Sequence, residues 1–477
     1  MSHKPNIVVF VTDTMRTAEL GCYGNDWIRT PHIDAFAGQS MRFTRAYPES
    51  LPTIPVRRAL HTGRRCYPFR NYNPVKWDIV YLPGWQAMDN DEDTLAETLA
   101  GAGYQTGFVT DTLPYFAPGF NFQRGFWQWE YIRGQQQDRW KSPHSVSRER
   151  LARYTDPDTV YANSKSLHSI APMHLANTAH VEDESQTTTA RTFQWAMEFV
   201  EDNAAGQPFY LTIDCFDPHE PWEAPQNYYE MYGDPNYSGR RHLHVKYAPR
   251  SENGYSDEEF DYIKAQYCGL VSLVDTWFGR FIEKLDELGL SDNTMVVFVS
   301  DHGTNFCDNP KDIIGKPAYA MYPGLVHLPL MVRMPDGAGA GVTCNELVYN
   351  LDVTATAYDV AGLESEQGID GQSLAPLIEG NTDRWRLRDY VTCRYGHNMV
   401  AIDDTHHIML NADREVEGAF DLTVDPACSN DLTGKVDKAV IDRAWDRLLA
   451  DAGGEALPDY REKAQVTDAI GQKAERY

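Results

Sequence analysis

Two acidic residues stand directly after short, β-branched apolar runs in this 477-residue sequence. Residues 6–12 read NIVVFVT and lead into Asp13, and residues 294–300 read TMVVFVS and lead into Asp301, with His302 next. Such runs are typical of buried parallel strands. The carboxyl ends of parallel strands lie at one edge of a sheet, so we expect both acids at the edge where ligands bind. Taken alone, each acid could equally be a turn residue or a helix cap.

A hydroxyl group stands at the start of a predicted helix in residues 52–64, which read PTIPVRRALHTGR. Pro55 suits the first turn of a helix, so Thr53 is expected at or next to the N-cap. A hydroxyl there faces free backbone N–H groups and a partial positive charge of roughly half an elementary unit. Arg57, one turn later, can lie over the same end. By itself this pattern more often means a capped helix than a catalytic group.

Helices and buried strands must alternate to position these residues. Helical patterns at 93–104 and 188–203 are each followed by a strand-like run, at 106–110 and 208–216. Ser256 and Glu259 form a capping box that opens a long helix ending near residue 288. The alternation predicts an α/β fold with a mostly parallel sheet flanked by helices.

Two regions depart from this alternation. Residues 119–180 lack clear periodicity and indicate an insertion that shapes a pocket or a subunit contact. Its aromatic residues could line a substrate pocket, although aromatic stripes more often serve packing; they include Phe126, Trp127, Trp129, Tyr131 and Trp140. After residue 377, three strand-like runs and a helical tail predict a small antiparallel sheet with a helix, with the runs at 389–394, 399–402 and 407–410. We therefore divide the chain into a catalytic domain, 1–377, and a C-terminal α+β subdomain, 378–477.

Composition limits the partners of the protein. Hydrophobic residues make up 42% of the chain and aromatic residues 12%, as in a folded globular protein. The formal net charge of −26 argues against nucleic acid or an anionic membrane as the main partner. That charge would also repel an anionic substrate at long range, so an anion site here must be a local positive island built from a metal and a few cations.

Hydropathy and cysteine usage point to a compartment. No segment approaches the ~20 apolar residues of a membrane helix. The apolar run at residues 7–11 is too short for the core of a signal peptide. The eight cysteines are scattered without Cys-x-x-Cys pairs, which predicts reduced thiols and a cytoplasmic protein.

The segment around Thr53 resembles the sulfatase signature, in which a Cys or Ser stands two residues before Pro and four before Arg, ahead of Thr-Gly-Arg. Those places are taken here by Thr53, Pro55, Arg57, Thr62, Gly63 and Arg64. The strand ending in Asp13 resembles the family's first metal-binding strand. Three further segments resemble family motifs in the right order, at 271–279, 296–303 and 417–426. The chain is therefore identified as a member of the sulfatase family of the alkaline phosphatase superfamily, which implies an alkaline-phosphatase-like fold.

The resemblance implies one catalytic divalent metal ion bound by Asp13, Thr53, Asp301 and His302. Two carboxylates, an imidazole and a hydroxyl oxygen suit Mn, Ca, Mg or Zn. A metal on the oxygen of Thr53 would lower the pKa of that hydroxyl and bring the oxyanion of the substrate within attack distance.

Further site residues follow from the same comparison. Arg57 and Lys316 could stabilise charge on the oxygens of the transferred group, since the resemblance places a lysine close to Lys316. His219, in the DPHEPW run at 217–222, matches the family histidine near the leaving group and is a candidate general acid. His327 and His397 are further pocket candidates, but a structural role is favoured for both.

Three departures from the family bear on the substrate. Thr53 stands where sulfatases have a Cys or Ser that is oxidised to formylglycine, and a threonine cannot form that aldehyde because its β-carbon carries a methyl group. Residues 110–113 read TDTL where sulfatases carry Gly-Lys-Trp-His. The phosphonate monoester hydrolase branch is also threonine-rich at this place, so the change fits that branch better. The paired acids at the end of the first strand are reduced to Asp13 and Thr14, which favours Mn, Zn or Mg over a tight calcium cage, unless Thr14 or a water fills the gap.

We therefore predict a hydrolase that cleaves phosphodiesters or phosphonate monoesters through a threonine nucleophile. A covalent adduct of threonine must be hydrolysed at its central atom, which phosphorus chemistry tolerates in the wider superfamily. Three alternatives remain open: a sulfate ester hydrolase that works without formylglycine, a phosphomonoesterase or phosphotransferase, and a catalytically inactive relative that binds an anion. The expected partner is a small anionic ester, and the sequence leaves a homo-oligomer open.

Overall fold

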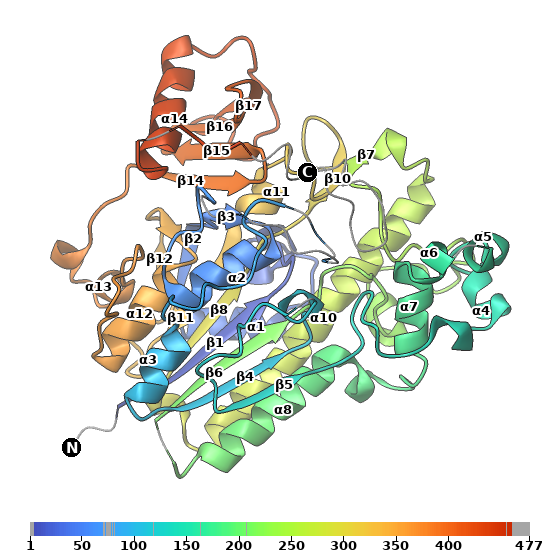
Figure 1. The fold of residues 1–477 in the computed structure, drawn as a ribbon, viewed down its shortest axis with the longest axis horizontal. Coiled ribbons are helices and arrows are strands. Elements are labelled where there is room, and N and C mark those ends of the chain that lie inside the picture. The colour runs from blue at the N-terminus through green and yellow to red at the C-terminus, as the bar shows by residue number, and fades with distance from the viewer. Residues whose placement is uncertain are drawn as a thin grey trace.

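The computed structural model describes residues 4–69, 72, 78, 80, 82–117, 119–162, 164–206, 208–454 and 456–459. Its centre is a nine-stranded sheet of order β12-β2-β11-β8-β1-β6-β4-β5, with β13 also paired to β2 (Figure 1). The strands are β1 (Asn6–Thr12), β2 (Met41–Tyr47), β4 (Gln105–Thr110), β5 (Gln128–Tyr131), β6 (Phe209–Cys215), β8 (Thr294–Ser300), β11 (Leu328–Arg333), β12 (Thr343–Cys344) and β13 (Val348–Tyr349).

Five neighbouring strands, β5, β4, β6, β1 and β8, run parallel, and β11 runs antiparallel between β8 and β2. The predicted mostly parallel sheet is thereby confirmed. The register aligns the carboxyl ends of the three central strands, because Thr12 pairs with Ser300 on one side and with Cys215 on the other. Beyond these pairs the backbone N–H of Asp13 donates to the carbonyl of Cys215, and that of Asp301 donates to the carbonyl of Thr12.

Helices cover both faces of the sheet (Figure 1). Alternate side chains of β1 point to opposite faces, as strand geometry requires. Ile7, Val9 and Val11 pack in one core with α2 (Thr53–Thr62), α3 (Leu95–Gly101) and α12 (Asp352–Ala361). Val8 and Phe10 pack in the other core with α1 (Pro31–Gly38), α8 (Thr188–Asn203) and α10 (Asp257–Glu287). The predicted capping box at the start of α10 is present, with both hydrogen bonds between Ser256 and Glu259.

A second sheet of five strands has the order β17-β16-β15-β14-β3. Four of them follow residue 377 and pair antiparallel, namely β14 (Tyr390–Tyr395), β15 (Asn398–Asp403), β16 (His406–Asn411) and β17 (Val416–Asp421). The helix α14 (Lys438–Asp451) packs on them through Ala444 and Leu448. The strand β3 (Ser50–Leu51), which directly precedes α2, joins this sheet in parallel with β14. The C-terminal sheet therefore anchors the approach to Thr53, and the division at residue 377 stays a prediction.

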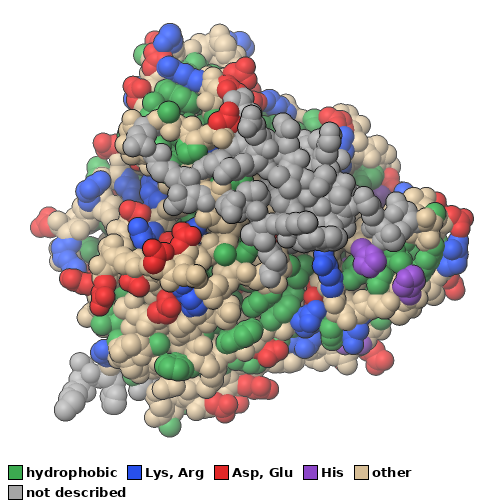
Figure 2. Space-filling view, viewed as in Figure 1, with side chains coloured by type: hydrophobic (Ala, Val, Ile, Leu, Met, Phe, Trp, Pro, Cys, Tyr) green, Lys and Arg blue, Asp and Glu red, His purple; other side chains and the backbone are tan. Residues whose placement is uncertain are grey.

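The insertion at 119–180 begins with β5 and continues in short helices. These are α4 (Arg148–Ala152), α5 (Pro157–Tyr161), α6 (Ser164–Leu167) and α7 (Ile170–Asn177), with a small core of their own. Helices this short leave little periodicity in a sequence. Trp127 is 71% exposed and Trp129 46% exposed, and Figure 2 shows hydrophobic side chains on the face that β4 and β5 present.

Smaller elements complete the molecule. A three-stranded sheet of order β7-β10-β9 contains β7 (Ala248–Pro249), β9 (Asn305–Phe306) and β10 (Ile313–Gly315), and short helices form at α9 (Gln226–Tyr229), α11 (Pro323–Val326) and α13 (Ala375–Ile378). Within the described ranges, no helix is both long and apolar enough to cross a bilayer. All eight cysteines are free thiols.

Candidate active site

The predicted acids meet at the carboxyl edge of the central sheet. Asp13 follows β1 and Asp301 follows the neighbouring β8, so the register of the two strands brings them together. Both are wholly buried, as is His302. One ligand atom from each of these three residues lies within 4.8 Å of the others. The structure thus assembles three of the four predicted metal-binding side chains.

The ring of His302 is held in one neutral form. Its Nδ1 lies 2.9 Å from the carbonyl oxygen of Gly303, which can only accept a hydrogen bond, so Nδ1 carries the proton. The bare Nε2 faces the carboxylates, 3.5 Å from Oδ2 of Asp301 and 3.9 Å from Oδ1 of Asp13. Burial lowers the pKa of His302 to about 4, so the ring is neutral at pH 7. A lone pair aimed at two carboxylates is favourable when a cation lies between them.

The electrostatics of the two carboxylates support the same conclusion. Burial raises the pKa of Asp13, and the negative charge of Asp301 raises it further. Burial also raises the pKa of Asp301. Among the described residues, none donates a hydrogen bond to the buried Oδ2 of Asp13, although Nη1 of Arg57 lies 3.2 Å away. Two carboxylates and one imidazole nitrogen are donors that fit a hard or borderline divalent cation. The residues present therefore fit the implied metal ion.

Arg57 lies beneath these acids and is held by Asp214, a residue that the sequence analysis did not single out. The guanidinium makes two hydrogen bonds to Asp214, of 2.8 Å and 2.9 Å, and also pairs with Asp13 and Asp301. Thr112 and Tyr115 each donate to Asp214 at 2.7 Å. Burial lowers the pKa of Arg57, but these carboxylates raise it by more. Because Arg57 is wholly buried, its direct contact with a substrate stays a prediction.

Thr53 is the first residue of α2, next to the N-cap Pro52, as the position of Pro55 predicts. It lies over the acids, since its carbonyl oxygen accepts from the same Nη1 of Arg57 that contacts Asp13 and Asp301. A cavity of about 230 Å³ opens beside it. The cavity is lined by Thr53, His219, His302 and Lys316, with Pro52, Val80, Trp85, Pro114, Gln136, Gln137, Phe216, His244, Tyr247 and Tyr395. That the hydroxyl of Thr53 binds a metal ion stays a prediction.

The predicted general acid His219 is also held in one form. Its Nδ1 lies 2.6 Å from the carbonyl oxygen of Glu220, so Nδ1 carries the proton and Nε2 is bare. Burial and the charge of Lys316 lower the pKa of His219 to about 4. In this form the ring accepts a proton at Nε2 before it can donate one.

Thr14, the residue after Asp13, links both acids to Lys316 by hydrogen bonds. Its backbone N–H donates to Asp301 at 3.0 Å, its hydroxyl donates to Asp13 at 2.8 Å, and Nζ of Lys316 donates to that hydroxyl at 3.2 Å. The φ of Thr14 is +67°, a left-handed conformation that is a true outlier for a β-branched residue and costs on the order of 1–3 kcal/mol. Such strain persists where the surroundings hold a functional geometry in place.

Other candidates lie elsewhere. Asp111, the acid of the TDTL run, accepts from the backbone N–H of Phe216 at 2.7 Å. His327 hydrogen-bonds the carbonyl oxygen of Thr44, and His397 pairs with Asp413. None of Asp111, His327 and His397 is among the described residues that line the cavity, and neither are the aromatic residues of the insertion. The insertion contributes Gln136 and Gln137 instead.

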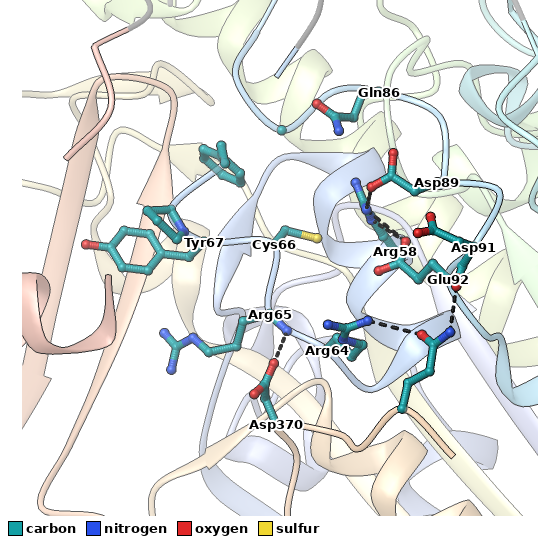
Figure 3. A pocket seen from close by; sticks show the side chains of 14 residues that line it. Arg58, Arg64, Arg65, Cys66, Tyr67, Gln86, Asp89, Asp91, Glu92 and Asp370 are labelled. Carbon is teal, nitrogen blue, oxygen red and sulfur yellow. Dashed lines mark hydrogen bonds and ion pairs between the residues drawn. The ribbon is translucent and has the colours of Figure 1, made fainter. Parts of the chain in front are cut away.

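A larger cavity, of about 670 Å³, lies beside the C-terminal half of α2 (Figure 3). Its cationic side chains already have partners. Arg58 pairs with Asp89 and Glu92, and Nη1 of Arg64 donates to Gln367 at 3.2 Å. Its described lining residues contain neither a histidine nor a cluster of metal ligands. The smaller cavity therefore remains the candidate active site.

Comparison with known proteins identifies relatives along most of the chain. Residues 5–363 match the family model described as Sulfatase, and residues 318–452 match the C-terminal model of N-sulphoglucosamine sulphohydrolase. An arylsulfatase of Clostridium perfringens is 25% identical over 455 residues, which cover 89% of each chain. A choline-sulfatase of Rhizobium meliloti is 24% identical, covering 94% of this chain and 86% of its own.

The fold is shared with solved structures of related enzymes. The phosphonate monoester hydrolase of Agrobacterium radiobacter superposes with a TM-score of 0.71 at 20% identity, covering 95% of this chain and 96% of its own. The corresponding enzyme of Silicibacter pomeroyi gives a TM-score of 0.69 at 20% identity, covering 99% and 100%. The family model spans well over half of the chain and includes every strand of the central sheet. The chain therefore belongs to the sulfatase family, within the alkaline-phosphatase-like superfamily of hydrolases that act on ester bonds.

Proposed function

We propose that this hydrolase cleaves phosphodiesters or phosphonate monoesters, with Thr53 as the nucleophile. The observation that supports this most is the place of Thr53, at the start of α2 and in the wall of the cavity that also contains His302 and Lys316. A threonine cannot provide the aldehyde hydrate that lets a sulfate adduct collapse without attack on sulfur. Its adduct must be opened by water at the central atom, a reaction that phosphorus esters undergo readily.

The metal site and the lysine supply the positive charge for this reaction. A divalent cation bound by Asp13, Asp301 and His302 would polarise the ester and lower the pKa of the Thr53 hydroxyl. The ammonium group of Lys316 binds an oxygen of the transferred group. Arg57 keeps the two carboxylates at a fixed spacing beneath the cavity.

His219 moves the protons. In the first step the oxygen of Thr53 forms a bond to phosphorus while the bond from phosphorus to the leaving oxygen breaks. Nε2 of His219 takes the hydroxyl proton and passes it to the leaving oxygen, so that it acts first as a base and then as the predicted acid. In the second step a water molecule attacks phosphorus, Nε2 takes its proton, and the released Thr53 oxygen recovers that proton.

Sulfate ester hydrolysis without formylglycine is the second candidate. Its support comes from relatives that are named as sulfatases of aryl, choline and N-acetylglucosamine esters. The two candidates differ in the atom that water attacks, so they predict different substrates for one nucleophile.

A panel of nitrophenyl esters tests the proposal. The protein loaded in turn with Mn, Ca, Zn or Mg is assayed with the sulfate, the phosphate, the phosphodiester and the phenylphosphonate. We expect turnover of the diester and the phosphonate, a loss of at least about a hundredfold in Thr53→Ala, and retained activity in Thr53→Ser. Thr98→Ala, on the neighbouring α3, is the matched control, because its hydroxyl bonds Thr94 and Tyr358, neither of which is among the described residues that line the cavity.

Each contrary outcome has a defined meaning. Turnover of the sulfate with an inert diester and phosphonate would replace the proposal by the second candidate. If no ester is hydrolysed and Thr53→Ala still binds phosphate as the native chain does, the protein is an inactive relative that binds an anion.

A further inference from the structure

A buried carboxylate lies directly behind the lysine of the active-site cavity. Oε2 of Glu220 is 2.6 Å from Nζ of Lys316, and Glu220 is wholly buried. Glu220 is not among the described residues that line the cavity, whereas Lys316 is. A charged pair removed from water in this way must be held by good geometry and by further hydrogen bonds.

Glu220 has those further partners, and they also line the cavity. The hydroxyl of Tyr247 donates to Oε1 at 3.0 Å, and Nδ1 of His219 lies 3.1 Å from Oε2. Burial raises the pKa of Glu220, but Lys316 and His219 lower it by more, so the carboxylate is ionised. One buried residue thus contacts three side chains that line the cavity: its carboxylate binds Lys316 and Tyr247, and its backbone carbonyl oxygen accepts from Nδ1 of His219.

This carboxylate changes the charge that a substrate meets. Among the described lining residues, Lys316 is the one lysine or arginine, and Glu220 offsets its charge. The charge of Arg57 beneath the cavity is likewise offset by Asp214. A divalent cation would be offset by Asp13 and Asp301. The site therefore has little surplus positive charge to hold a second negative charge on a ligand.

We propose that Glu220 is a positioning and specificity-determining residue, which makes the cavity select esters whose transferred group carries one negative charge over doubly charged monoesters. The inference rests on the proposed function, since it concerns the same cavity, and it favours diesters, phosphonate monoesters and sulfate esters over phosphomonoesters. It also has a consequence for turnover. Hydrolysis of a phosphodiester yields a monoester that ionises to a dianion. The same balance of charges that lets the singly charged substrate bind therefore lowers the affinity for the doubly charged product.

The test compares two tetrahedral anions that differ by one charge. Binding of methyl sulfate and of inorganic sulfate is measured by calorimetry at pH 8, for the native chain and for Glu220→Gln. Glutamine keeps the shape and an oxygen acceptor but removes the charge. We expect the affinity for sulfate relative to methyl sulfate to rise by about tenfold or more, because an unscreened Lys316 attracts the extra charge. The ratio of kcat/KM for nitrophenyl phosphate over the diester should rise with it.

A second variant, Lys316→Gln, should change the affinity for sulfate relative to methyl sulfate in the opposite direction. In Lys316→Gln the charge of Glu220 is unopposed, so the preference should move further toward methyl sulfate. The double variant Glu220→Gln with Lys316→Gln restores the original charge, so the ratio should return to near the native value even if both anions bind more weakly. If the substitutions only disrupted the shape of the cavity, the two single variants would not shift the anion ratio in opposite directions. Should Glu220→Gln fail to fold, as judged by circular dichroism, the double variant decides the question: a ratio near the native value supports the inference, and a ratio like that of Lys316→Gln alone overturns it.

Glu223→Gln is the matched control. It lies three residues further along the same segment and removes the same net charge. Its carboxylate pairs with His174 at 3.0 Å and lines a different cavity. We expect no change in the anion ratio.

The inference is overturned if Glu220→Gln leaves the ratio unchanged, or if Glu223→Gln shifts it equally. It can fail alone, with the diester still hydrolysed through Thr53. The proposed function can also fail alone, with sulfate esters as the substrates and the charge preference still present.

Discussion

Two consecutive arginines of α2 meet different surroundings, one beneath the smaller cavity and one in the wall of the larger. Arg57 is wholly buried and pairs with Asp13, Asp214 and Asp301. Arg58 points to the larger cavity, where its guanidinium pairs with Asp89, which is about half exposed, and with Glu92. Two neighbouring positions on the helix thus separate a wholly buried cluster of charges from a partly exposed one.

The difference between the two cavities shows which features indicate an active site. The cavity beside Arg58 is the larger, about 670 Å³ against about 230 Å³, and it contains more arginines. Its ion pairs are partly exposed to solvent, since Asp89 is 48% exposed and Arg58 14%, so solvent screens them more than it screens the Arg57 cluster. Beside Arg57, buried carboxylates repel one another and a neutral imidazole faces them, an arrangement that a bound cation would stabilise. Volume and positive charge are therefore weaker guides than unrelieved buried charge.

The largest effect should come from the carboxylates at Arg57. Asp13→Asn and Asp301→Asn each remove one ligand charge from the site, and we expect ester hydrolysis to fall by at least about a thousandfold. Asp89→Asn makes the same change beside Arg58 and should leave kcat/KM within about twofold. Initial rates with a saturating metal check both. Equal losses at the two positions would remove the distinction between the cavities.

A second effect concerns stability. Arg57→Met leaves three buried carboxylates without their cation and should lower the free energy of unfolding by about 3–5 kcal/mol. Arg58→Met breaks pairs that are partly exposed and should cost less than Arg57→Met, about 1–2 kcal/mol. Urea unfolding of both variants in a metal-free buffer provides the comparison. A similar loss in both would show that burial of the Arg57 cluster contributes nothing special.

The smallest effect is the pH dependence of metal binding. The raised pKa values of Asp13 and Asp301 mean that both hold a proton at a pH where an ordinary aspartate is ionised. Protons and the cation therefore compete, and affinity should rise as the pH rises through those values. The pKa of His302 is lowered to about 4, so its imidazole is already a neutral ligand above that pH.

Calorimetric titration with Mn between pH 5 and pH 8 measures this dependence. We expect the affinity to rise with pH, with protons released on binding. In Asp13→Asn the slope should be smaller, because one of the two titrating groups is gone. An affinity independent of pH in the native chain would show that the carboxylates do not bind the ion.

Much of the fold could be predicted from local pattern. The strands that precede Asp13 and Asp301 lie as predicted, because short β-branched apolar runs of this length favour buried strands. The strand β11 was missed, since it contains Pro329, which argues against a central strand; it is accommodated at an irregularity between Leu328 and Leu330. The short helices of the insertion left no periodicity to find.

The site could be predicted in part, through residues that belong to a sequence motif. Asp214 was missed, although an acid inside the apolar run of β6 is itself a signal of a buried partner. Glu220 had no such signal, because its neighbours in sequence gave no reason to bury it. Its partner Lys316 is 96 residues away.

The sequence by itself determined the family, the parallel strands and the residue types at their ends, because apolar runs and motif spacing are local properties of a chain. The tertiary structure alone decided which charges are balanced. Burial and pairing depend on groups brought together from distant segments, and the energy of a charge depends on what surrounds it. The pairing of Arg57 with Asp214 and of Lys316 with Glu220 is therefore visible only in the folded molecule.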